Sequence, residues 1–212
     1  MRALFPLALL CASAPLAAET PAAMAGLYDG SQTEMATGIE LSADGSFRYG
    51  LSYGAIDETA EGVWSAEGDK LLLTTQPSVI PPRFAVVEEK AAPNGTLIVK
   101  LANPEVLRGI PLLIDVIYAD GKPPESVQVG DDGNVPVEWA RRPMIIAPRL
   151  PVYPAPLTMV RMPANEGRRV TFKFEPNDIG TADFRNEALT IEKGELVLQR
   201  FDRTIRFRKV PG

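Results

Sequence analysis

The sequence predicts an all-β protein. Apolar and polar residues alternate with a period of two along most of the chain, as they do in strands that bury one face. The 17 glycines and 20 prolines interrupt this pattern at short intervals, which is typical of the turns in sandwiches and barrels. No window shows convincing helical amphipathicity. We therefore expect many short strands joined by turns.

The clearest early element is a hairpin over residues 37–51. A three-residue loop at 43–45, with glycine supplying positive φ, sets Leu41 opposite Phe47 and keeps the apolar side chains on one face. The same register sets Ile39 opposite Tyr49 and Glu40 opposite Arg48. A second hairpin follows over residues 62–74, with Trp64 near Leu71 or Leu73. A strand over residues 84–88 comes next.

The last strands predict a three-stranded meander. A turn at Lys193-Gly194 places Ile191 opposite Leu196, and a tight turn at 202–203 places Phe207 opposite Leu198. One face of the meander would then be apolar, and three strands cannot bury such a face alone. This face consists of Leu189, Ile191, Leu196, Leu198, Ile205 and Phe207.

The middle of the chain predicts short strands and almost no helix. Asn103 resembles a helix cap followed by Pro104, but Gly109 and Pro111 limit the helix to about one turn. The expected strands cover residues 97–102, 112–118, 134–138, 143–147, 157–162 and 169–174.

Two family resemblances extend this prediction. The segments GIPLLIDVIYADGK (109–122) and GDDGNVPV (130–137) resemble transthyretin-like and carboxypeptidase-regulatory-like modules, which implies a β-sandwich. The segments GLYDG, LSADGSFRYG and EGVW (61–64) resemble parts of a lipocalin-like barrel, although lipocalins carry their Gly-x-Trp motif on the first strand. Five early and three late strands would make eight, a number that closes a small barrel.

These segments predict a small barrel or sheet with a sandwich inserted into it. The barrel-like domain would span 24–90 plus 177–212, and the sandwich 93–175. The alternative is two successive domains, 24–92 and 93–212.

Residues 1–18 have the pattern of a secretory signal peptide: Arg2, an apolar run, and small residues around Ala17. We expect a periplasmic or secreted protein that loses its one cysteine, Cys11, with the leader. A lipoprotein anchor would require a small residue before Cys11, where Leu10 stands. No later apolar run is long enough to span a membrane as a helix. The net charge of −5 argues against nucleic acid as a partner.

The absence of histidine limits the possible chemistry. Without histidine or a mature cysteine, a Ser-His-Asp triad, a cysteine nucleophile and an imidazole or thiolate zinc site are excluded. We expect no cofactor and no metal. A hydrolase using two carboxylates, Asp57 and Glu61, is one open alternative.

The leading functional prediction is a non-catalytic exported protein that binds another protein or an envelope component. Its binding strip would be the proline-rich segment 143–156, through Ile145, Ile146, Leu150 and Tyr153, with Arg141 and Arg142 as cationic neighbours. The other alternative is a small-ligand carrier whose barrel pocket is lined by Tyr28, Tyr49, Tyr53 and Trp64.

Overall fold

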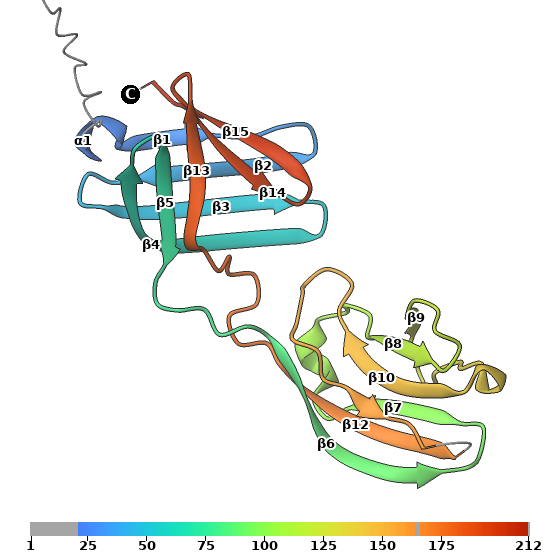
Figure 1. The fold of residues 1–212 in the computed structure, drawn as a ribbon. Helices are drawn as coiled ribbons and strands as arrows, with labels where there is room; N and C mark the ends of the chain where they lie inside the picture. Colours follow the sequence, from blue (N-terminus) through green and yellow to red (C-terminus); the bar gives the residue numbers. More distant parts are fainter. Residues whose placement is uncertain (1–20, 164–165, 212) are drawn as a thin grey trace, which may run out of the picture.

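The computed structural model describes residues 21–163 and 166–211, and the predicted leader with Cys11 lies outside them. The described residues form a closed eight-stranded barrel, a four-stranded sheet and a three-stranded sheet (Figure 1). Helix in these ranges is limited to α1 (Pro21–Met24) and two 3₁₀ turns, η1 (Pro104–Leu107) and η2 (Trp139–Arg141). None of these helices has the length and hydropathy of a membrane-spanning segment. The all-β prediction is confirmed.

The barrel takes its strands from both ends of the chain. In ring order they are β1 (Gly26–Asp29), β15 (Arg203–Lys209), β14 (Glu195–Arg200), β13 (Arg185–Glu192), β5 (Lys70–Thr75), β4 (Ile56–Glu67), β3 (Ser46–Tyr53) and β2 (Met35–Leu41). Every neighbouring pair is antiparallel, and β15 closes the ring on β1. Because β13 pairs with β5, the residues between them are an insertion into the barrel.

The hairpin registers follow the sequence prediction except at the last turn. Leu41 lies opposite Phe47, as predicted, and Trp64 lies opposite Leu73. Phe207, however, lies opposite Leu196 and not Leu198. The turn residues are 201 and 202, both with positive φ, which makes a two-residue loop one position earlier than expected. The register therefore shifts by two residues, and the same side chains stay on the buried face.

The barrel interior is filled by side chains. Ile39, Leu71 and Phe207 are fully buried in one apolar cluster. Phe184 joins them from the segment that leads into β13, and its ring lies 6.1 Å from Phe47 and 5.0 Å from Tyr49, measured between centroids. A returning connector thus contributes to the core, which ties the insertion to barrel stability.

The inserted residues form two sheets around a second apolar cluster. The four-stranded sheet has the order β11 (Val160–Arg161), β10 (Pro143–Arg149), β8 (Leu113–Tyr118), β9 (Glu125–Gln128). The three-stranded sheet has the order β6 (Arg83–Ala92), β12 (Gly167–Glu175), β7 (Leu97–Leu101). The sequence prediction assigned residues 84–90 to the barrel domain. Strand β6 pairs with β12 along its whole length, so these residues belong to the sandwich.

Two predicted strands of the sandwich differ in the structure. Residues 134–138 make only an isolated bridge between Asn134 and Ile98, and 157–162 shorten to the two residues of β11. Prolines at 154, 156 and 163 flank the second segment, and each removes a backbone donor that a strand would need. Strand β9 was not predicted, since its sequence ESVQ carries one apolar residue. The one-turn helix after Asn103 is confirmed as η1.

Candidate functional site

The barrel interior holds the aromatic side chains that were predicted to line a ligand pocket. Tyr28 and Trp64 are buried, and each donates a hydrogen bond to a backbone carbonyl, at 2.7 and 3.0 Å. Tyr53 is half-buried and accepts a hydrogen bond from Arg203 Nη2 at 2.8 Å. Tyr28, Tyr53 and Trp64 pack as part of the barrel core, whereas Tyr49 also borders a cavity of about 510 Å³. An eight-stranded barrel can be filled by side chains or can hold one small ligand. The carrier hypothesis stays a prediction.

Tyr49 lies at the polar end of this interior. It is 4% exposed, and its hydroxyl makes no hydrogen bond within the described residues. Burial raises the pKa of Tyr49 to about 12; the charge of Arg200 opposes this shift and that of Glu58 adds to it. Arg200 Nη2 and Glu58 Oε2 form an ion pair at 2.6 Å. This end of the barrel therefore contains a paired charge and one unsatisfied hydroxyl.

Part of the predicted partner-binding strip is not on the surface. Ile146 is fully buried and Leu150 is 3% exposed, both in the sandwich core. The prediction that these two side chains are exposed is therefore wrong, although Leu150 still borders a cavity. Strand β10 lies between β8 and β11, so proline does not make it an edge strand, and one of its faces packs against the opposite sheet. Ile145 is half-buried, opposite Ile117 and Arg161 on the neighbouring strands.

The predicted cationic neighbours have different environments. The Arg141 guanidinium stacks on the Tyr118 ring at 3.9 Å and pairs with Asp120 at 2.9 Å and Glu125 at 2.7 Å. The hydrogen bond to Asp120 raises the pKa of Arg141, and the same bond lowers the pKa of Asp120. Arg141 is thus occupied within the chain, whereas Arg142 is exposed.

Two of the predicted strip residues line open cavities: Leu150 borders two of them and Tyr153 borders three. The three cavities have volumes of about 640, 270 and 360 Å³. The largest lies where barrel residues 57 and 59 approach the sandwich, and we call it the seam groove. Its apolar lining residues are Val106, Leu107, Ile110, Leu150, Tyr153, Phe174, Pro176 and Ile179. The second cavity also reaches the barrel, through Glu58 and Arg200.

Two connectors hold the barrel beside the sandwich (Figure 1). They bind each other, since Asp178 accepts a hydrogen bond from Ile80 N at 2.8 Å and donates its own N–H to Ile80 O at 3.1 Å. The returning connector also binds the barrel, where Thr59 N donates to Gly180 O at 2.9 Å. Gly180 has a φ of 84° and an added Cβ would lie 3.2 Å from Asp57 O. The wall of the seam groove is therefore fixed to β4.

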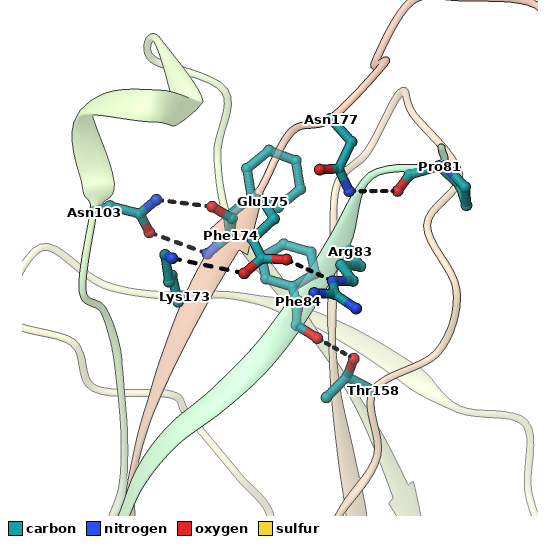
Figure 2. Close-up of polar contacts among 9 residues, drawn as sticks. All are labelled: Pro81, Arg83, Phe84, Asn103, Thr158, Lys173, Phe174, Glu175 and Asn177. Carbon is teal, nitrogen blue, oxygen red and sulfur yellow. Dashed lines mark hydrogen bonds and ion pairs between the residues drawn. The ribbon is translucent and has the colours of Figure 1, made fainter. Parts of the chain in front are cut away.

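A second set of polar contacts fixes the sandwich side of the groove (Figure 2). The Asn103 side chain donates to Phe174 O at 2.8 Å and accepts from Phe174 N at 3.0 Å, so its amide pairs with β12 as another strand would. Arg83 pairs with Glu175 at 2.5 Å across β6 and β12. Asn177 donates to Pro81 O at 2.9 Å, joining the two connectors.

The backbone beside the groove is open. Residues 151–157 form no strand, and no backbone hydrogen bond between described residues includes them. Thr158 then ties this segment to β6, donating from its hydroxyl to Phe84 O at 2.6 Å (Figure 2). Leu157 is 69% exposed. We call residues 151–157 the open strip; it offers unpaired carbonyl and amide groups next to an apolar groove.

The proposed catalytic carboxylates do not converge. Asp57 and Glu61 lie on the same exposed face of β4, four residues apart, which corresponds to about 13 Å along a strand. Glycosidases of either stereochemical class hold their two carboxyl groups within about 10 Å. Within residues 21–163 and 166–211, no group of three histidine, cysteine, aspartate or glutamate side chains is placed to hold a metal ion.

The chain matches no family model, no curated protein and no solved structure in the three comparisons made.

The sequence analysis named Leu150 and Tyr153 as partner-binding residues and Asp57 as a candidate carboxylate, but it missed the other residues that line the seam groove. Val106 lies within the single helical turn η1, Ile110 follows that turn, and Ile179 stands alone in a polar connector, so none belongs to a periodic pattern. The signal that could have found them is the pair of apolar residues around the turn after Asn103, since such a short turn cannot bury them itself.

Proposed function

We propose that this chain is an exported, non-catalytic binding protein that holds an extended segment of a protein partner in the seam groove. The observation that carries the proposal is that Tyr153 borders three cavities and lies within a strip whose backbone is unpaired. The leader pattern in residues 1–18 supports export to the periplasm or beyond.

The groove suits a polypeptide because it combines two kinds of contact. Its apolar walls, with Tyr153 as an aromatic anchor, can bury a partner's side chain. The open strip can bind a partner's main chain through its carbonyl groups and through the N–H groups of its four residues other than proline, at 152, 153, 155 and 157. Together the apolar walls and the open strip suit an extended segment that has at least one apolar residue.

The barrel acts as a support in this proposal. All of its strands are paired on both sides, so it offers no edge to an added strand. Its contribution is to hold β4 and the returning connector as one wall of the groove.

Panning a random-peptide library against the immobilised full chain tests the proposal. We expect enrichment of peptides with an apolar residue, and at least a tenfold loss of their affinity in Tyr153→Asp. Leu27→Asp is the matched control, because Leu27 is 53% exposed on β1 and lies outside the groove lining. Tyr153→Phe keeps the ring and should keep most of the binding.

Two outcomes would contradict the proposal. One is the absence of any enriched peptide; the other is equal loss of affinity in Tyr153→Asp and Leu27→Asp. Fluorescence of Trp64 in the barrel core and of Trp139 beside the sandwich core shows whether each variant is folded. Export is tested separately by cell fractionation, where we expect a processed protein outside the cytoplasm.

A further inference from the structure

The seam groove carries one charged side chain on each wall. Asp57 comes from the exposed face of β4 in the barrel, and Arg108 from the residue after η1 in the sandwich. Both are exposed, and neither makes a side-chain hydrogen bond or an ion pair with another described residue.

The two charges are therefore free to bind a partner. Each of the other charged side chains that border Tyr153 in the second cavity has a partner: Glu58 and Arg200 pair with each other, Asp183 pairs with Arg185, and Asp178 accepts from Ile80 N. Asp57 and Arg108 share one lining but lie beyond the 4 Å of an ion pair, so they form no ion pair with each other.

We infer that the groove selects segments by charge: an apolar residue flanked by a basic residue on the barrel side and an acidic residue on the sandwich side. This inference rests on the proposed function. Asp57 attracts the basic residue and Arg108 the acidic one, while the apolar residue between them enters the lining around Tyr153. Exposed charges of this kind contribute modestly to affinity and mainly set the choice of partner and its orientation.

The chain provides a close control for each charge. Arg142, like Arg108, is an exposed arginine with positive φ directly after a 3₁₀ turn, but it does not line the groove. Glu67 lies on β4, as Asp57 does, and is exposed at the far end of that strand. Charge reversal at Arg142 and Glu67 therefore changes the net charge equally without changing the groove.

The test repeats the library panning with the full chain and the reversal variants Asp57→Lys, Arg108→Glu and the double variant. We expect wild-type peptides to carry a basic and an acidic residue on opposite sides of an apolar one. Each single reversal should lower the affinity for the consensus peptide about twofold to fivefold. The double variant should prefer the charge-inverted peptide, and Arg142→Glu with Glu67→Lys should leave the preference unchanged.

Each outcome decides one of the two proposals. Enriched peptides without a charge preference, or a preference that the double variant does not invert, would overturn this inference and leave the binding function standing. If no peptide is enriched by the wild-type chain, the proposed function itself fails.

Discussion

The barrel and the sandwich differ in how completely their backbones are paired. Each of the eight barrel strands has a hydrogen-bonded neighbour on both sides, whereas the two sandwich sheets end in four edge strands, β11, β9, β6 and β7. The sandwich also carries the open strip beside the seam groove. The closed barrel therefore supports one wall of the groove, while the unpaired backbone that a partner can bind belongs to the sandwich.

Core truncations should have the largest effects and should separate the two units. Phe207→Ala in the barrel and Phe172→Ala in the sandwich each remove a fully buried ring, which costs about 3–5 kcal/mol. The chain has two tryptophans, Trp64 in the barrel core and Trp139 beside the sandwich core, so each unit has its own fluorescent reporter.

We expect Phe207→Ala to lower the denaturation midpoint seen by Trp64, and Phe172→Ala the midpoint seen by Trp139. Single-tryptophan versions, Trp139→Phe and Trp64→Phe, make the two signals separable. If both reporters always shift together by the same amount, the barrel and the sandwich unfold as one cooperative unit and the distinction between them is wrong.

Breaking the ion pair at the polar end of the barrel should have the next largest effect. Arg200→Met leaves Glu58 without its partner, and because both side chains are only partly buried we expect a loss of about 2 kcal/mol. The double variant with Glu58→Met should recover most of that loss, since no charge is then left unpaired. Urea denaturation followed by the fluorescence of Trp64 measures the stability of both variants. A double variant less stable than Arg200→Met would contradict the role given to this ion pair.

Removing the amide clamp on β12 should cost somewhat less. Asn103→Ala leaves the N–H and the carbonyl of Phe174 without a partner, and we expect a loss of about 1–2 kcal/mol in the sandwich transition. Asn103→Asp can still accept a hydrogen bond from the N–H of Phe174, so its stability should lie between that of the wild type and that of Asn103→Ala. Loss of stability reported by Trp64 alone would show that the clamp does not act on the sandwich.

Tyr49→Phe should have the smallest effect, with the opposite sign. Removing a buried hydroxyl that has no hydrogen-bond partner among the described residues should stabilise the barrel by about 1 kcal/mol at neutral pH. Because burial raises the pKa of Tyr49 from 10.0 to about 12, the unfolded tyrosine ionises first, and stability is lost as the pH rises between these values. The difference between wild type and Tyr49→Phe should therefore widen above pH 10. A constant difference across this range would show that the hydroxyl is not buried as described.

Regular alternation let the sequence predict the barrel better than the site. The 37–51 hairpin was predicted to the residue because period-two patterning and one glycine turn left a single register that separates the faces. The predicted position of the last turn was wrong by one residue, because Phe201 adopts positive φ and its residue type does not suggest this.

The candidate site was harder to predict, because it lies where elements from distant parts of the sequence meet. Tyr153 was found because prolines surround it, yet the same rule placed Ile146 on the surface, whereas its side chain is fully buried in the core between the two sandwich sheets. Asp57 and Arg108 lie 51 positions apart in sequence and share a groove only because the connectors bring β4 to the sandwich. No local pattern contains that information.

Hydrogen exchange of the full chain, with and without an enriched peptide, tests the binding site most directly. We expect the peptide to slow exchange at the amides of Val152, Tyr153 and Ala155, and in the connector at residues 177–180, while exchange in β1 and β2 stays unchanged. Slower exchange that is confined to barrel strands away from the groove, or to the edge strand β6, would place the partner elsewhere. Either result would contradict the seam groove as the binding site.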